Sequence, residues 1–360
     1  NSPRHGSCGS PEMGGDDDNY GGFGLPFAVF VIAGWASINL ALNFFNSYAL
    51  RPEEKGGLGF SFPFFYSGCH QIASFIGVNV IFKVKPQLNT LSMAQWKAKW
   101  PALFGLSVMM VLNIGCNNAS LVYVGLSVNQ IIKSITPLPT MILSYFTEAK
   151  RYTWTLVGIV MVQVIGAIVA VPWHEQTRAG AIGIGLCFIS MLAAATKPVV
   201  AGVLMKDMRE SGLTPLVLVW YDSIFSIAWF FLISLCLPNE RVGAVAYMQK
   251  NAALGWGLIL IGSSMAFVYN IVVFYLTKVT SALTNVVLAN VKQVILIVVA
   301  AVFVDHITRW QNLLGIVIFF LASFAYSYYT FTNRALSRTP STVTKPADES
   351  TGLVKEKSNA

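Results

Sequence analysis

The sequence predicts an all-α integral membrane protein whose ten transmembrane helices form two inverted five-helix repeats. Three observations predict this fold class: the composition, the spacing of the apolar runs and a similarity between the two halves of the chain. Of the 360 residues, 55% are hydrophobic and 11% are charged, whereas a soluble domain carries about 25% charged residues. With a mean hydropathy of +0.60, the chain is typical of a polytopic membrane protein, and a soluble enzyme is excluded.

The apolar runs give the number of spans. A hydrocarbon core of about 30 Å needs about 20 apolar residues per helix. Runs of about this length lie at 27–49, 62–82, 101–123, 127–147, 154–172, 180–203, 213–236, 252–276, 280–304 and 311–332. Lysine and arginine are concentrated in the loops that become cytosolic when both termini are placed in the cytosol. We therefore expect ten spans with both ends of the chain cytosolic.

The segments outside the spans are polar and carry few signals. We expect residues 1–26, rich in Gly, Ser and Asp, and residues 333–360 to be disordered in the cytosol. The five cysteines have no CxxC spacing, so neither a metal site nor a cofactor is expected. The cytosolic loops account for most of the net charge of +8, so no nucleic-acid partner is needed. Membrane lipid surrounds the helices, and the oligomeric state, a homodimer included, stays open.

The two halves of the chain resemble each other at a fixed offset. A shift of 157 residues (305 minus 148) places Glu148 on Asp305 and Gly158 on Gly315. Because a repeat of five spans is odd, the second copy must be inverted in the membrane. The first repeat would cover 27–172 and the second 180–332. Inverted repeats are the architecture of secondary transporters, which bind their substrate near the midplane between the halves.

Three lysines lie inside the predicted spans: Lys133, Lys197 and Lys292. Each costs about 2.5–3.5 kcal/mol at the centre of a bilayer, so such residues mark functional sites. By helical rise, Lys133 lies about 12 Å into its span and Lys292 about 18 Å into a span that enters from the opposite side. Both therefore fall near the midplane. Lys197 lies near the cytosolic end, where it either snorkels to water or joins the site.

Two midplane ammonium groups predict an anion site, and a phosphate or diphosphate is the natural ligand of two such point charges. The alternative is a structural ion pair with Asp222, which would still leave one lysine charge uncancelled. Pro137 and Pro139 predict a break in the span that carries Lys133. The remaining candidate ligand-binding residues are polar or aromatic side chains in the same spans or on facing helices: Asn129, Gln130, Tyr221, Tyr269, Asn270, Asn285, Asn290 and Gln293.

Two segments resemble a known family. "NNASLVYVGLSVNQIIKSITP" (117–137) and "LTNVVLANVKQVILIV" (283–298) are similar to the span three-to-four and span-nine segments of the nucleotide-sugar and triose-phosphate translocators, within the drug/metabolite transporter superfamily. The resemblance covers about 27–332. It implies ten helices in two inverted repeats and an antiport activity. In that family, a nucleotide sugar is commonly exchanged for a nucleoside monophosphate at the Golgi, or phosphate compounds are exchanged at the plastid.

Two departures from the family pattern bear on the substrate. Phosphate-translocating members carry a Lys-Arg pair in span nine, whereas Gln293 follows Lys292 here. Nucleotide-sugar members carry an aromatic-and-amide motif in span seven that contacts the base. Here "WYDS" (220–223) stands at that place, with Tyr221 matching in type and Asp222 replacing an amide.

The sequence therefore favours a nucleotide-sugar antiporter of the Golgi or endoplasmic reticulum, in which Lys133 and Lys292 hold phosphates. Tyr221, Tyr269 and Asn270 would shape the base and sugar pockets. A sugar-phosphate/phosphate antiporter is the second hypothesis. A proton-coupled carrier that uses Asp222 is the third, and a membrane scaffold without transport activity is the fourth.

Overall fold

The computed structural model describes residues 25–148, 151–173, 178–211, 215–279, 292–306 and 309–338, and its regular elements in these ranges are helices. The confirmed all-α class consists of α1 (Leu25–Leu50), α2 (Pro63–Val84), α3 (Met93–Tyr123), α4 (Leu126–Lys133), α5 (Pro137–Glu148), α6 (Trp154–Ala170), α7 (Arg178–Ser211), α8 (Pro215–Cys236), α9 (Pro238–Lys250), α10 (Ala252–Val279) and α12 (Trp310–Arg338). A further apolar helix runs over Lys292–Val304 and ends in a π-helical turn at Ala300–Val304. Short 3₁₀ turns lie at Glu53–Lys55 and Pro86–Leu88.

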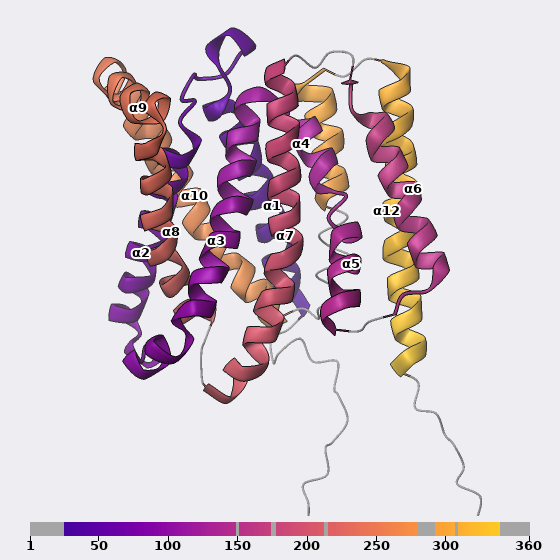
Figure 1. Ribbon diagram of the computed structural model, residues 1–360, viewed down its shortest axis with the longest axis horizontal. Coiled ribbons are helices and arrows are strands. Elements are labelled where there is room, and N and C mark those ends of the chain that lie inside the picture. The colour runs from indigo at the N-terminus through magenta and orange to yellow at the C-terminus, as the bar shows by residue number, and fades with distance from the viewer. Residues whose placement is uncertain are drawn as a thin grey trace, which may run out of the picture.

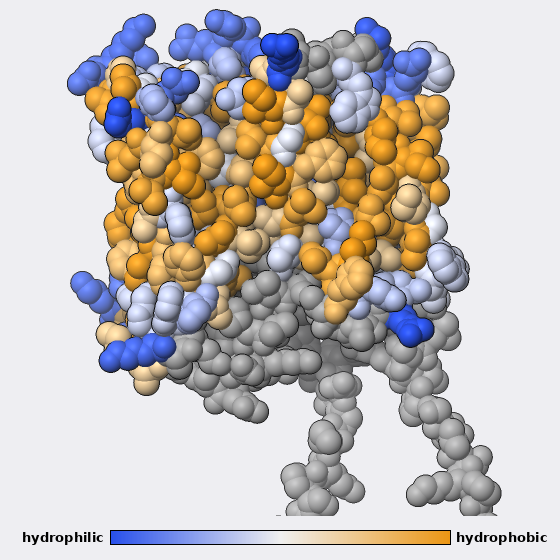
Figure 2. All heavy atoms as spheres, viewed as in Figure 1, coloured by the Kyte–Doolittle hydropathy of each residue, from blue (hydrophilic) through white to orange (hydrophobic). Residues whose placement is uncertain are grey.

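The described helices suit a membrane. Six of them are long and apolar enough to cross a bilayer: Val29–Leu50, Trp100–Tyr123, Arg178–Thr196, Leu216–Cys236, Ala252–Val272 and Trp310–Thr330. Two more apolar helices, Trp154–Ala170 and Lys292–Val304, are shorter. Figure 2 shows apolar side chains as a broad band across the middle of one face, with hydrophilic residues above and below it. The chain is therefore a multi-pass membrane protein, whereas the count of ten spans stays a prediction.

Helices far apart in the sequence lie side by side. α1 runs beside α10, α2 beside α8, α3 beside α7 and α6 beside α12 (Figure 1). α4 contacts the π-helical end of helix 292–304. These contacts bring elements from the first and second halves of the chain together around the centre of the bundle.

The span predicted over 127–147 is divided into two helices. α4 ends at Lys133, and α5 begins at Pro137. Pro137 has no amide hydrogen to donate, so it disrupts a continuous helix but fits the first position of a new one. The hydroxyl of Thr136 donates to the carbonyl of Lys133 at the break. The predicted break at Pro137 is thus confirmed, and it places Lys133 at the end of a helix.

A buried carboxylate fixes the start of α2. Glu240, at the start of α9, accepts hydrogen bonds from the backbone amides of Phe64 (3.0 Å) and Phe65 (2.9 Å). These amides belong to the first turn of α2, where no intrahelical acceptor is available. Glu240 is 5% exposed. The interaction anchors α2, which lines the central cavity described below.

Glu240→Ala should lower the free energy of unfolding by about 1–3 kcal/mol, because both helix amides lose their buried acceptor. Burial raises the pKa of Glu240 above its ordinary value of 4.5, against the opposing effect of the Phe65 and Phe64 amides. An acid whose pKa is higher in the folded state stabilises the fold most below its unfolded pKa. Relative to Glu240→Gln, the melting temperature of the wild type should therefore rise as the pH falls from about 7 towards about 4.5.

A pH-independent difference between these two proteins would contradict the protonation argument. Glu54→Gln is the control, because Glu54 is an exposed acid on the neighbouring connection. Thermal unfolding of the purified proteins measures both effects.

Candidate functional site

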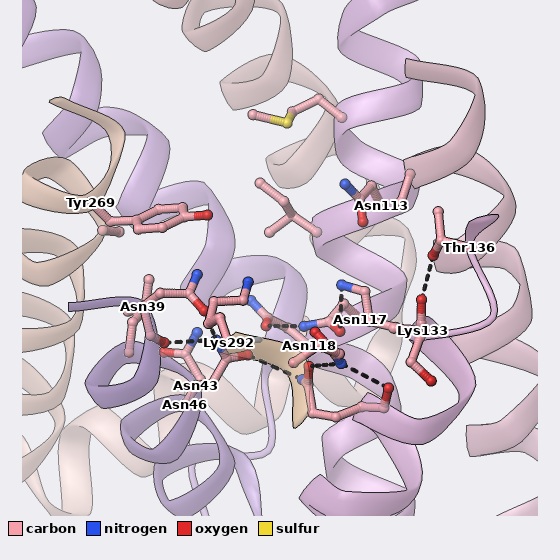
Figure 3. A pocket seen from close by; sticks show the side chains of 18 of the residues that line it. Asn39, Asn43, Asn46, Asn113, Asn117, Asn118, Lys133, Thr136, Tyr269 and Lys292 are labelled. Carbon is pink, nitrogen blue, oxygen red and sulfur yellow. Dashed lines mark hydrogen bonds between the residues drawn. The ribbon is translucent and has the colours of Figure 1, made fainter. Parts of the chain in front are cut away.

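A polar cavity of about 700 Å³ lies at the centre of the bundle (Figure 3). It is lined by residues of α1, α2, α3, α4, α5, α7, α10, α12 and helix 292–304. At one end the lining includes Tyr152, just before α6, and Tyr326, in the second half of α12. The cavity is of the size that binds small molecules, for which about 300–1,000 Å³ is usual.

Lys133 and Lys292 both line this cavity. Lys133 Nζ donates to Asn117 Oδ1 at 3.0 Å. Lys292 Nζ lies over the ring of Trp35, 5.1 Å from its centroid. The one ion pair among the described residues joins Arg51 to Asp305 elsewhere, so neither cavity lysine has an acidic partner there. Two ammonium groups held by neutral partners leave the cavity positively charged and suited to an anion.

Asparagine side chains form much of the remaining lining, and the sequence analysis did not single them out. Asn39, Asn43 and Asn46 follow one another at helical spacing on α1. Asn113 and Asn117 do the same on α3, next to Asn118. Residues three or four apart share one face of a helix. A row of amides on one face of an apolar span is a signal that could have located this cavity from the sequence.

α2 supplies a second uncharged group of lining residues that the sequence analysis missed: His70, Gln71 and Ser74. Asn270 on α10 donates to Ser74 Oγ at 3.1 Å. Thr136 and Thr140 add hydroxyls from the α4–α5 break and α5. The cavity therefore combines two ammonium groups with many neutral hydrogen-bonding groups.

Six of the twelve candidate residues line the cavity together: Gln130, Lys133, Tyr269, Asn270, Lys292 and Gln293. Tyr269 and Lys292 lie across the cavity from Lys133 in Figure 3. Gln293 Nε2 donates to the backbone oxygen of Gln130 (2.8 Å) and to its Oε1 (2.9 Å). This contact joins α4 directly to helix 292–304.

Three candidates lie outside the cavity lining. Asn129 is fully buried and donates to Asn117 Oδ1 (3.1 Å) and Ser120 Oγ (2.6 Å), so it supports the wall rather than forming it. Tyr221 donates to the carbonyl of Ser92 at 3.2 Å. Asp222 is buried on the same helix, α8. The physical reason is that α8 packs on the back of α2, and the cavity is lined by α2 instead.

The side chains of the other three candidates lie outside the described part of the structure, so their positions relative to the cavity stay predictions. Asn285 and Asn290 lie outside the described residues. Lys197 belongs to α7, but its side chain lies outside the described part of the chain.

Arg51, Ser127 and Asp305 form a second cluster, called the latch below. Asp305 Oδ1 accepts from Arg51 at 2.6 Å, and Oδ2 accepts from the backbone amide and the hydroxyl of Ser127, both at 2.6 Å. The ion-pair side chains are only 15% and 11% exposed. A methyl group on Gly125 would lie 2.6 Å from Asp305 Cγ, so glycine is needed for the carboxylate to reach the start of α4. The latch ties α4 to the end of helix 292–304.

The chain is similar to known transporters over most of its length. UDP-uronic acid transporter 1 of Arabidopsis thaliana is 27% identical over 83% of this chain and 94% of the relative. UDP-galactose transporter 1 of the same plant is 26% identical over 84% and 86%. A protein named "Probable sugar phosphate/phosphate translocator", also from this plant, is 26% identical over 80% and 91%.

The profile of the UAA transporter family matches residues 53–330, which is more than half of the chain. The resemblance drawn from the two lysine segments is thereby confirmed, and the expectation that the chain is no enzyme agrees with the family and with its relatives. The chain belongs to the UAA transporter family and is a multi-pass membrane transporter.

Proposed function

We propose that the protein is a nucleotide-sugar antiporter, which exchanges a nucleotide sugar for a nucleoside monophosphate across an endomembrane. The observation that carries this proposal is the cavity, whose lining combines two lysines, with no described acid beside them, with many neutral amides. Lys133 and Lys292 would bind the phosphates. Tyr269, Asn270 and the α2 side chains would bind the uncharged base or sugar. Two of the relatives are named as transporters of UDP-linked sugars, which supports this substrate class.

Alternating access follows from the proposed inverted repeats, 27–172 and 180–332. The helix contacts support this symmetry. If the first five spans are exchanged with the last five, the contact of α3 with α7 becomes that of α10 with α1. The contacts of α2 with α8 and of α6 with α12 are unchanged by this exchange, because each pair consists of equivalent spans from the two halves. The ten-span count is part of this proposal, with α4 and α5 together forming the fourth span.

The structure corresponds, in this proposal, to the conformation that is open to the cytosol. The cavity lining reaches Tyr152, which lies beside the basic connection before α6 that we assign to the cytosol. The latch lies at the other end of α4, where it would close the luminal side. Both termini would then be cytosolic, in the Golgi or endoplasmic reticulum membrane.

Obligatory exchange would follow from the charge of the empty cavity. Between its two open conformations, the transporter must pass through a conformation in which the cavity is closed to water on both sides. Without a ligand, two uncancelled ammonium groups would be enclosed there in a low-dielectric environment, which is unfavourable. A bound phosphate removes this cost, whichever direction the substrate is carried. Proteoliposomes loaded with a nucleoside monophosphate should therefore take up labelled nucleotide sugar at least ten times faster than empty ones. Equal uptake into loaded and empty vesicles would contradict antiport.

The substrate can be identified by ligand-induced thermal stabilisation of the purified protein. A ligand present at 100 times its dissociation constant adds about 2.7 kcal/mol if it binds only the folded state. We expect this from one nucleotide sugar and from the monophosphate of the same base, but not from the free nucleobase. Absence of any shift with every phosphate compound would overturn the proposed function.

A sugar-phosphate/phosphate antiporter is the second candidate, and the similarity to the named sugar phosphate translocator favours it. The amide of Gln293 is directed to Gln130, and its position offers no third cation beside Lys292. Competition distinguishes the two candidates. Inorganic phosphate should compete strongly with the substrate of a phosphate exchanger and weakly with that of a nucleotide-sugar antiporter.

A further inference from the structure

The two cavity lysines are held by partners that carry no charge. Asn117 Oδ1 accepts from Lys133 Nζ at 3.0 Å, and the ring of Trp35 lies below Lys292 Nζ at 5.1 Å. A neutral partner orients an ammonium group without cancelling its charge, whereas a carboxylate would do both. The choice of partner therefore decides how strongly each lysine can attract an anionic ligand.

Asn117 is itself fixed in one orientation. It is 9% exposed on α3, and its Oδ1 also accepts from Asn129 Nδ2 at 3.1 Å. Its Nδ2 donates to Asn118 Oδ1 at 3.3 Å (Figure 3). The oxygen thus faces two donors and the nitrogen faces an acceptor, so rotating the amide by half a turn would lose all three contacts. The oxygen is held toward Lys133.

A line of amides continues from Asn117 to Gln293, on the helix that carries the other lysine. Asn129 Oδ1 accepts from Gln130 Nε2 at 2.8 Å. Gln130 Oε1 accepts in turn from Gln293 Nε2 at 2.9 Å, and Gln293 is the neighbour of Lys292 in sequence. Uncharged groups thus connect the partner of one lysine to the residue beside the other, across the two halves of the chain.

We infer that Asn117 is a positioning residue for anion recognition: it directs Lys133 Nζ into the cavity and leaves its charge available, while the amide line fixes the separation of the two ammonium groups. This inference rests on the proposed function, since it assigns Asn117 a role in the binding of phosphate by Lys133. Asn117 itself need not touch the ligand.

The decisive change is Asn117→Asp, because aspartate keeps the shape of asparagine and adds one negative charge. The carboxylate would form an ion pair with Lys133 at hydrogen-bond distance, inside a low-dielectric region where such pairs are strong. The ligand phosphate would have to displace it. We expect the dissociation constants for nucleoside mono- and diphosphates to rise at least tenfold, while the ligand-free melting temperature is unchanged or higher.

Asn113→Asp is the matched control. Asn113 lies one turn earlier on the same face of α3 and lines the same cavity. Its Oδ1 accepts from Ser190 at 3.2 Å, which a carboxylate can also do. The same charge is thus added to the same cavity without the contact to Lys133, and we expect at most a threefold loss of affinity. Equal losses in Asn113→Asp and Asn117→Asp, or wild-type affinity in Asn117→Asp, would overturn the inference.

A double-mutant cycle separates positioning from a purely structural role. Asn117→Ala should weaken ligand binding when Lys133 is present and have no further effect in the Lys133→Met protein, because only Lys133 transmits its influence. Additive losses would contradict the inference. The proposed function has its own test within the same set: if the wild type binds no nucleotide, both fail, and if only Lys133→Met loses binding, the inference alone fails.

Discussion

Lys133→Met and Lys292→Met should each weaken the binding of the nucleotide substrate at least 30-fold, and the double variant should show no transport. Removing one member of a buried, hydrogen-bonded charge pair costs about 2–5 kcal/mol, and every 1.4 kcal/mol is a factor of ten. Methionine retains the length and apolar character of the lysine stem, so the packing around α4 and helix 292–304 is preserved. The measurements are ligand affinity by thermal shift and exchange in proteoliposomes.

The stability of the ligand-free variants distinguishes a binding role from a structural one. A lysine inside the bilayer costs about 2.5–3.5 kcal/mol, so its removal from an unoccupied site should leave the melting temperature unchanged or raise it. A structural lysine would instead lower it. Lys83→Met, at an exposed position in the last turn of α2, is the control and should bind as the wild type does. Wild-type affinity in both cavity variants would show that the two lysines do not bind substrate.

The second large effect concerns the latch. Asp305→Asn should shift the protein toward the conformation open on the luminal side by about 30-fold, because Arg51 loses its ion pair and Ser127 loses a charged acceptor. The ion pair is neither exposed nor fully buried, with 15% and 11% exposed side chains. Its loss should cost about 2 kcal/mol, between the values for surface and buried pairs.

Thiol labelling measures this shift. Val128 is buried and lines, together with the latch residues themselves, a second and smaller cavity. In a background without the five native cysteines, a cysteine at position 128 should react about 30 times faster with a membrane-impermeant maleimide from the luminal side when Asp305→Asn is present. Glu53→Gln, an exposed acid near Arg51, is the control. An unchanged labelling rate, or slower labelling in Asp305→Asn, would show that the latch does not close this side.

The sequence predicted the helical class, the break at Pro137 and the two lysines that the structure brings into one cavity. Each of these depends on a local property: apolar length, the missing amide of proline, or a charge inside an apolar span. Which side of a helix faces the cavity does not follow from such a local property. α8 is apolar around most of its circumference, so nothing in its sequence showed that Tyr221 and Asp222 lie away from the cavity and that α2 lies in between.

The neutral cavity wall could have been found in part. The spacing of Asn39, Asn43 and Asn46 is a local signal, and so is that of Asn113 and Asn117. The partners of these residues are not local, however. Asn117 meets Lys133 only because α4 ends where it does, and Gln293 meets Gln130 from a helix more than 150 residues away. Such contacts depend on the packing of the two halves, which a single sequence does not specify.

The shortness of α4 has a mechanical consequence. This eight-residue helix carries a latch residue, Ser127, near its first turn and a cavity lysine, Lys133, at its end. The two are about 9 Å apart along the axis, and neither glycine nor proline lies between them. If α4 tilts as a rigid body by about 10° about its Lys133 end, its Ser127 end moves by about 1.6 Å. This movement is enough to separate the Ser127 amide from Asp305 Oδ2. The first step of opening, release of the latch, would thus be too small for distance measurements on the nanometre scale, whereas hydrogen exchange at the Ser127 amide would report it.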